Sequence, residues 1–133
     1  MEIAFTATDG SAVDLAKMKG KVVLVDFWAT WCGPCVAEMP NVIAAYSKFK
    51  DKGFEVVGIS LDQDRAALDG FTKQNGMTWP QHFDGMGWDS ELVKKFGIRG
   101  IPATFLIGKD GKIAASDLRG EELESNLARL LAE

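Results

Sequence analysis

The chain has 133 residues, of which 47% are hydrophobic, enough to bury one core of ordinary size but not two. Its formal net charge is −4, with both signs interspersed and no basic run, which argues against a nucleic-acid or anionic-membrane surface. No apolar stretch approaches the roughly 20 residues that cross a bilayer, and the start, Met1 to Phe5, does not resemble a signal peptide. We therefore expect one domain over 1–133, either complete or excised from a longer exported or membrane-anchored protein.

Strand and helix patterns alternate in the first half of the chain. Two continuous apolar runs rich in β-branched residues, at 21–28 and 54–61, are typical of strands buried on both faces. Between them, apolar residues at helical spacing predict a helix over 38–52, and Gly53 is placed to end it.

The second half of the chain continues with shorter elements. Asn75-Gly76 is a helix stop signal, and Lys109-Asp110-Gly111 is a strong turn signal for a hairpin. The predicted elements are a helix capped by Asp62 or Asp64 and running to about Asn75, a short helix at 91–96, hairpin strands at 104–107 and 112–116, and a helix at 121–131. This order predicts an α/β domain with a central mixed β-sheet flanked by helices on both faces.

Both cysteines of the chain lie in one pentapeptide, Trp31-Cys32-Gly33-Pro34-Cys35. With no other thiol, the chain has no disulfide framework and no spare sulfur for a structural metal. Two cysteines three positions apart, between a strand and a helix pattern, indicate a redox pair. Zinc needs four ligands and only His82 remains as a nitrogen donor, so we expect no metal site and read His82 as structural or exposed.

The position of each cysteine predicts its role. Cys32 is expected at the first turn of a helix, where free N–H groups and the helix dipole lower a thiol pKa from about 8.5 toward about 7. Cys35, one turn further on, is expected to be more buried and to keep its proton. Cys32 would then attack a substrate disulfide, and Cys35 would resolve the mixed disulfide. Gly33 keeps the turn narrow, and Pro34 suits the start of a helix.

Asp26 lies inside the apolar run 21–28. A carboxyl group in such a strand loses its hydration, which raises its pKa and allows it to carry a proton. The alternative is a capping or ion-paired aspartate at a strand end. We favour proton transfer, because an unpaired buried acid destabilises the fold and is therefore expected to be kept for a function.

Two segments of the chain resemble the thioredoxins: Val25 to Cys35, which contains the cysteine motif, and Gly97 to Thr104, which contains Ile101-Pro102. The resemblance extends over nearly the whole chain and is closer to the TlpA/ResA branch of the superfamily. That branch has an opening strand pair, an acid shortly after the second cysteine and an insertion before the proline segment. The matching positions here are 5–7 with 12–15, Glu38, and 61–96.

The resemblance implies a thioredoxin-like fold with an N-terminal strand extension and an insertion before a cis-proline. It implies that Asp26 accepts the proton of the buried thiol and that Glu38 tunes the thiol pKa values, so which acid serves Cys35 is left open. A solvated helix glutamate is the alternative reading of Glu38. A cis bond before Pro102 would leave the Ile101 backbone free to pair with a substrate, and Trp31 would cover the thiols.

The leading interpretation is a thiol-disulfide oxidoreductase that reduces protein disulfides and uses no cofactor beyond the Cys32–Cys35 couple. A thiol peroxidase of peroxiredoxin type fits poorly, because Thr30 lies only two residues before Cys32. A non-catalytic peptide-binding or chaperone module is the third reading. The resemblance implies disulfide-containing protein substrates, an upstream thiol electron donor and a monomer. It favours an extracytoplasmic, periplasmic location, with a membrane tether outside this chain, over a cytoplasmic one.

Overall fold

The computed structural model describes residues 1–133 and is built around a five-stranded mixed sheet with strand order β5-β4-β3-β6-β7. The central strand β3 runs parallel to β4 and antiparallel to β6, which in turn pairs antiparallel with β7. The mixed central sheet is the predicted one. Its strands are β3 (Val22–Trp28), β4 (Phe54–Ser60), β5 (Gln81–His82), β6 (Ala103–Ile107) and β7 (Ile113–Ser116).

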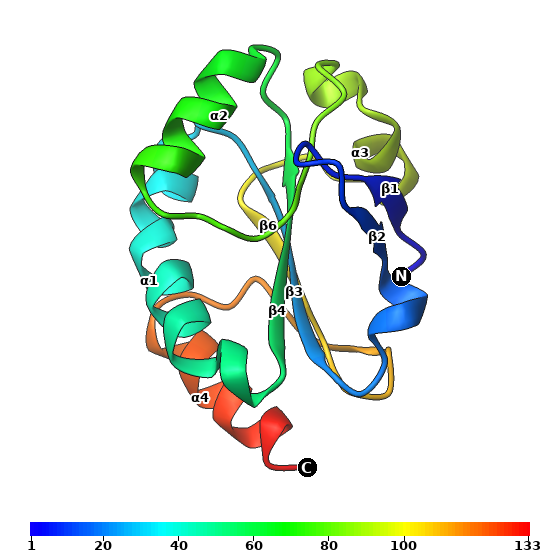
Figure 1. The fold of residues 1–133 in the computed structure, drawn as a ribbon, viewed down its shortest axis with the longest axis vertical. Coiled ribbons are helices and arrows are strands. Elements are labelled where there is room, and N and C mark those ends of the chain that lie inside the picture. Colours follow the sequence, from blue (N-terminus) through cyan, green and yellow to red (C-terminus); the bar gives the residue numbers. More distant parts are fainter.

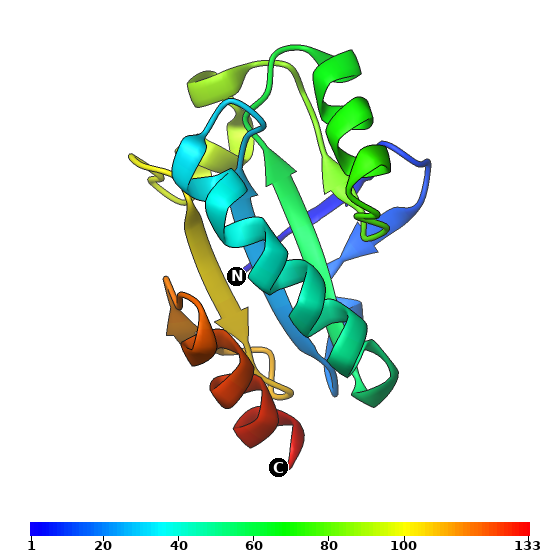
Figure 2. The ribbon, with the colours of Figure 1, turned by 90° about the vertical axis from the view of Figure 1, so that its left-hand side faces the viewer.

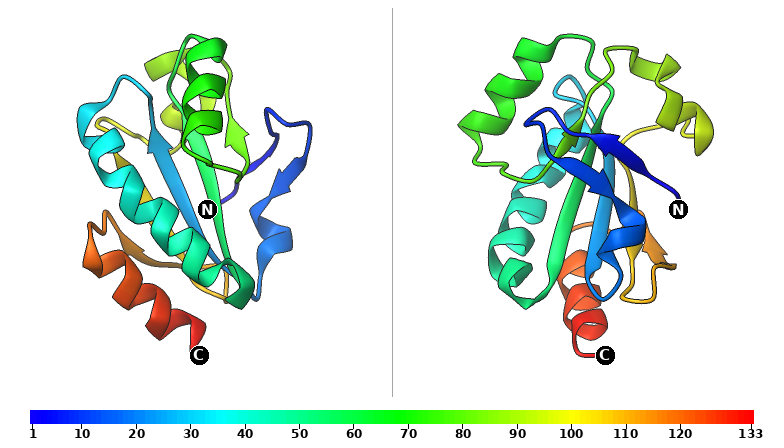
Figure 3. Two further views of the ribbon diagram at one scale, coloured as in Figure 1. Left: turned by 60° about the vertical axis from the view of Figure 1, so that its left-hand side comes forward. Right: turned by 45° about the vertical axis from the view of Figure 1, so that its right-hand side comes forward.

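Helices cover both faces of this sheet (Figure 1). The first face carries α1 (Gly33–Phe49), α2 (Arg65–Gln74) and α4 (Glu121–Leu131), and α1 and α4 lie side by side (Figure 2). The other face carries the short helix α3 (Glu91–Lys95) and a separate antiparallel hairpin of β1 (Ala4–Thr6) and β2 (Ala12–Asp14) (Figure 3). No helix is both long and apolar enough to span a bilayer.

The core is densest around β3, where all seven residues are buried. Trp28, at the end of β3, is fully buried and donates an indole hydrogen bond of 2.9 Å to Gln81 Oε1 on β5. Gly58 on β4 makes this contact sterically possible, because a Cβ at that position would overlap the Gln81 amide. The contact between Trp28 and Gln81 therefore helps to fix the end of β3, from which the cysteine motif follows.

Several element bounds differ from the sequence expectation. Helix α1 begins at Gly33 rather than at residue 38, and residues Lys50–Lys52 form a 3-10 turn. Apolar spacing gives no signal before residue 38, whereas the cysteine motif correctly placed Cys32 at the first turn, where its thiol sulfur is the cap. Strand β5 is too short to produce a periodic pattern, and Asp64 rather than Asp62 caps α2.

Candidate active site

The two cysteines lie at the junction of β3 and α1 and form a disulfide. Cys32 is the N-cap of α1, and its Sγ accepts a hydrogen bond of 3.2 Å from the Cys35 backbone N–H. Cys35 is 2% exposed and Cys32 5% exposed, so the predicted difference in depth is present but small. The Cys32 sulfur thus lies at the positive end of the α1 dipole and beside the Cys35 backbone N–H, a position that favours a thiolate in general.

The loop before β6 faces the disulfide. Its Ile101–Pro102 peptide bond is cis, and the Ile101 carbonyl oxygen lies 3.6 Å from Cys32 Sγ. The Ile101 N–H donates no backbone hydrogen bond. In Figure 2 this loop and the start of α1 lie at the same end of the molecule, where Gly33 and Pro34 are exposed. The site residues from the two resembling segments therefore meet in space.

Asp26 lies on β3 behind the disulfide and is 4% exposed. Its Oδ1 has no hydrogen-bond partner and the residue forms no salt bridge, so the capped or ion-paired alternative is wrong. Burial raises the pKa of Asp26 to about 7; the positive charge of Arg119 opposes this rise and the negative charge of Glu38 adds to it. A carboxyl group with this pKa exchanges a proton at neutral pH.

A small cavity joins Asp26, Cys35 and Glu38 and extends to Pro102 and Thr104. Its volume is about 10 Å³, close to the smallest space that holds one water molecule. The cavity therefore brings the buried thiol of Cys35 and the two acids to one place in the fold.

Glu38 is held in place by contacts at both carboxylate oxygens. Its Oε1 accepts a hydrogen bond of 2.7 Å from the Gly120 N–H, and its Oε2 accepts one of 3.2 Å from the Asn41 amide. Gly120 has φ +53 and ψ −127, a backbone conformation that L side chains rarely adopt. Glu38 is half-buried, so the reading of a freely solvated helix glutamate is wrong.

Sequence reasoning missed two residues that support the site. Arg119 donates a hydrogen bond of 3.3 Å to the Pro102 carbonyl and lies close enough to Asp26 to influence its pKa. Asp62, considered only as a helix cap, is 1% exposed and accepts hydrogen bonds from the Thr30 N–H, at 3.2 Å, and the Thr30 hydroxyl, at 2.6 Å. Arg119 and Asp62 both lie in loops, where the contacts of a side chain produce no periodic pattern in the sequence.

The positions of Trp31 and His82 also bear on the predictions. Trp31 was expected to cover the thiols, but it is 55% exposed and its ring packs against Trp88 instead. His82 is half-buried and packs edge-on against Phe5, and burial lowers its pKa; this fits the structural role expected of it. No group of three or more metal-ligating side chains is present.

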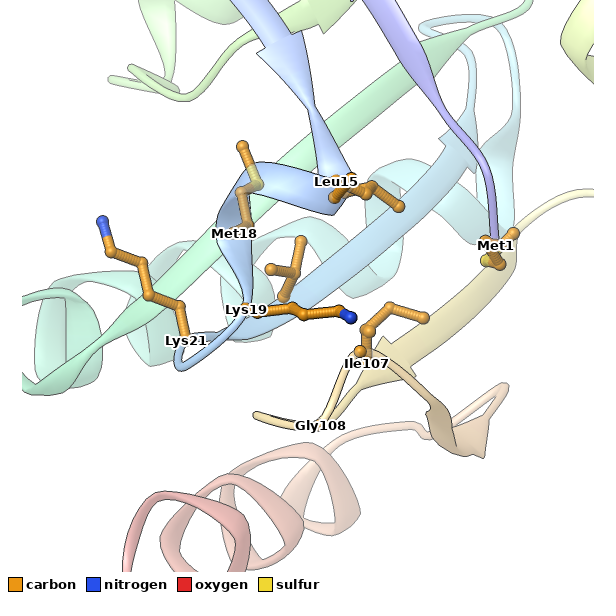
Figure 4. Close-up of a pocket in the computed structure, with 10 residues that line it drawn as sticks. Met1, Leu15, Met18, Lys19, Lys21, Ile107 and Gly108 are labelled. Atoms are coloured by element: carbon orange, nitrogen blue, oxygen red, sulfur yellow. The ribbon is translucent and has the colours of Figure 1, made fainter.

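A larger cavity of about 140 Å³ lies at the opposite end of β3, between residues 15–21 and the end of β6 (Figure 4). Its lining includes Lys19 and Lys21 but no cysteine, histidine or carboxylate side chain. None of the redox or proton-transfer groups described above faces it. The chemistry of the molecule is therefore concentrated at the junction of β3 and α1.

Comparison with known proteins identifies the family. The model of the Redoxin family matches residues 2–131. The chain belongs to the Redoxin family. Among its relatives, the thiol-disulfide oxidoreductase ResA of Bacillus thuringiensis subsp. konkukian is 37% identical over 129 residues, covering 96% of this chain and 72% of ResA. ResA of Bacillus subtilis is 34% identical over 106 residues, covering 80% and 58%.

Solved structures of other family members show the same fold. The thioredoxin domain of a thiol-disulfide oxidoreductase from Bacteroides vulgatus superposes with a TM-score of 0.87 and 31% identity, covering 98% of this chain and 94% of that one. A thiol-disulfide oxidoreductase from Bacteroides fragilis gives 0.85 and 30%, covering 98% and 97%. This Redoxin family member therefore has a thioredoxin-like fold of the TlpA/ResA type and is an enzyme, a thiol-disulfide oxidoreductase.

Proposed function

We propose that this enzyme reduces disulfides in proteins and is returned to its dithiol form by an upstream thiol donor. The observation that carries the proposal is the pairing of two thiols with different surroundings. Cys32 faces the half-buried Ile101–Pro102 segment, whereas Cys35 faces the cavity that Asp26 lines. One thiol is thus placed to meet a substrate and the other to lose a proton internally.

The reaction begins with the reduced enzyme. The Cys32 thiolate attacks one sulfur of the substrate disulfide, which breaks the substrate S–S bond, forms a mixed disulfide and releases the first substrate thiolate. Cys35 then loses its proton and attacks Cys32 Sγ, which re-forms the Cys32–Cys35 bond and releases the second thiolate. Two electrons pass from the enzyme dithiol to the substrate, and two protons end on the substrate thiols.

We assign Asp26 as the acceptor of the Cys35 proton. Both residues line the same small cavity, and the pKa of Asp26 is about 7, so the carboxylate is available near neutral pH. Glu38 lines the cavity as well and is half-buried, which suits transfer of that proton onward to solvent. In this proposal Glu38 tunes Asp26 and relays its proton, while Asp26 serves the thiol directly.

Substrate binding is assigned to the loop opposite the disulfide. An extended peptide would pair with the Ile101 N–H, which donates no backbone hydrogen bond within the chain. Exposed surface at Trp31, Gly33 and Pro34 completes the rim around Cys32. This arrangement recognises the backbone of a polypeptide and not a particular small molecule.

The cellular setting is proposed from the family resemblance. Relatives named ResA are thiol-disulfide oxidoreductases, and we propose that this chain likewise acts as a monomer on oxidised proteins outside the cytoplasmic membrane. Electrons would come from a partner thiol, and attachment to a membrane would need a segment that is not in this sequence. No cofactor other than the Cys32–Cys35 couple enters the proposed reaction.

The proposal is tested by comparing two substrates for the reduced enzyme, a disulfide-bonded protein such as insulin and hydrogen peroxide. We expect turnover with the protein disulfide, sustained by dithiothreitol, and no peroxide reduction above the rate of free dithiol. Thr30, the residue nearest to a peroxidase threonine in spacing, has both its N–H and its hydroxyl bound to Asp62. Efficient peroxide reduction with slow protein turnover would contradict the proposal.

Replacing Glu38 with glutamine tests the link between the two acids. Removing the negative charge of Glu38 favours ionisation of Asp26, so the Asp26 pKa should fall and the pH midpoint for resolution of the mixed disulfide should move to lower pH. Stopped-flow measurement of the resolving step between about pH 5 and about pH 9 gives this midpoint. Glu121→Gln, an exposed acid on α4, is the control. A midpoint that is unchanged or raised in Glu38→Gln would refute the assigned coupling.

A further inference from the structure

Four large hydrophobic side chains are exposed in the whole chain, and three of them belong to two short segments. Trp31 is 55% exposed and directly precedes the nucleophile Cys32, while Met86 is 54% and Trp88 45% exposed on the turn Gly87–Asp89 and its N-cap. These segments lie far apart in the sequence but at the same end of the molecule (Figures 2 and 3). The fourth, Ile113, is on the edge strand β7.

The two tryptophans are in contact but do not bury each other. Their ring centroids are 6.3 Å apart, with an angle of 51° between the rings, so they form one surface with both indoles open to solvent. Exposed apolar area of this kind forgoes the stabilisation that burial would give, and paired exposed aromatics commonly mark binding surfaces. Trp28, by comparison, is fully buried and makes the core contact that a structural tryptophan makes.

Both segments are held by contacts beneath them. Thr30, next to Trp31, is bound through its N–H and hydroxyl to the buried carboxylate of Asp62. The turn that carries Trp88 is followed by Ser90, which is fully buried, and by Val93, which is 2% exposed. The indoles are therefore presented by anchored backbone, which lowers the entropic cost of binding a partner on them.

The position of Cys32 determines what can lie on this surface. Any disulfide that reaches Cys32 Sγ brings its flanking residues past Trp31, because the two residues are adjacent in the chain. The neighbouring Gly33, Pro34 and Ile101 carry no charge and offer no electrostatic selection. The occupant of the tryptophan surface is thus the polypeptide on one side of the substrate disulfide, and the chemistry of the surface favours an apolar side chain.

We propose that Trp88 and Met86, together with Trp31, form an apolar platform that binds an aromatic or large aliphatic side chain next to the reactive cysteine of a polypeptide disulfide. This inference rests on the proposed function and adds a substrate preference to it. Trp88 and Met86, from the insertion before β6, become specificity-determining residues of the site. Disulfides with polar neighbours would react through the Ile101 backbone and Cys32 alone.

The test uses two synthetic peptide disulfides of equal length and charge that differ only in having Phe or Ser beside the attacked cysteine. We expect the wild-type enzyme to reduce the Phe peptide with a kcat/KM about tenfold higher than that of the Ser peptide, mainly through KM. Trp88→Ala should remove most of this preference by slowing the Phe peptide, with the Ser peptide changed by less than about twofold. Met86→Ala should act in the same direction, and Trp88→Phe should restore the preference.

Ile113→Ala is the matched control, because it removes an equally exposed apolar side chain away from the disulfide, and it should leave both peptides unchanged. Equal reduction of the two peptides by the wild type, or equal losses for both in Trp88→Ala, would overturn the platform while leaving the reductase intact. If the wild type reduces neither peptide although its Cys32–Cys35 disulfide still exchanges with dithiothreitol, the proposed function fails and the platform fails with it.

Discussion

Replacing Cys35 with serine is expected to trap the enzyme on its substrate as a covalent mixed disulfide. Cys32 remains free to attack, because its Sγ lies at the N-cap of α1 beside the Ile101 carbonyl, but no second thiol is present to resolve the adduct. Multiple turnover should fall by about 10³-fold or more, while the first attack stays fast. Mass spectrometry of the non-reduced product should show one substrate chain attached through Cys32.

Cys32→Ser is the matched control for this experiment. It should lose turnover to the same extent but form no adduct, because Cys35 lies within the first turn of α1 and lines the internal cavity with Asp26. Comparison of the two variants distinguishes the attacking thiol from the resolving thiol. An adduct on Cys35 in Cys32→Ser, at a rate comparable to that of the wild type, would contradict the assigned roles.

Replacing Asp26 with asparagine is expected to stabilise the oxidised protein and slow its catalytic cycle. Burial places the pKa of Asp26 at about 7 in the folded state, against 3.8 for an unperturbed aspartate. Between these values the folded state binds a proton that the unfolded state has lost, so Asp26 costs stability increasingly as the pH rises from about 4 to about 7. Above about pH 7 the cost levels off at about 4 kcal/mol.

Urea unfolding of oxidised wild type and Asp26→Asn at about pH 5 and about pH 8 measures this cost. The gain in the free energy of unfolding should be larger at the higher pH, by about 2–3 kcal/mol. Leu106→Ala, which removes a buried side chain from the neighbouring strand β6, should by comparison lose stability equally at both pH values. A gain for Asp26→Asn that does not depend on pH would show that Asp26 is already ionised in the folded state at about pH 5, and would contradict the raised pKa.

Resolution of the mixed disulfide should also slow in Asp26→Asn at neutral pH, because the Cys35 thiol loses its nearby proton acceptor. The combination of higher stability and lower activity is the mark of a strained functional group rather than of a structural one. Both effects have one cause, the burial of the Asp26 carboxyl group, which also raises its pKa.

Most of the architecture could be predicted from the sequence because its strongest signals are local. The run 21–28 is mainly apolar and forms the central strand, with all of Val22–Trp28 buried. The turn at 109–111 correctly predicted the hairpin of β6 and β7. The periodicity alone placed the start of α1 too late, because a cysteine sulfur caps this helix in place of the usual oxygen, whereas the cysteine motif correctly placed Cys32 at the first turn.

The parts of the site that escaped prediction depend on contacts between distant segments. Glu38 binds the N–H of Gly120, which lies 82 residues away, and this pairing is invisible in either local sequence. Trp88 packs against Trp31, which lies 57 residues earlier in the chain, and neither local sequence shows this pairing. Sequence patterns report burial and turns well, but they do not report which loops meet.

The reduction potential of the Cys32–Cys35 pair, measured against a dithiothreitol or glutathione series, tests the central claim most directly. The pKa of the Cys32 thiol, followed in the same samples, shows whether the helix terminus activates it. A protein-disulfide reductase of thioredoxin type should have a potential below about −230 mV, near the reducing end of the family's range. A potential near about −120 mV, as in enzymes that donate disulfides, would contradict the reductase account and reverse the proposed direction of electron flow.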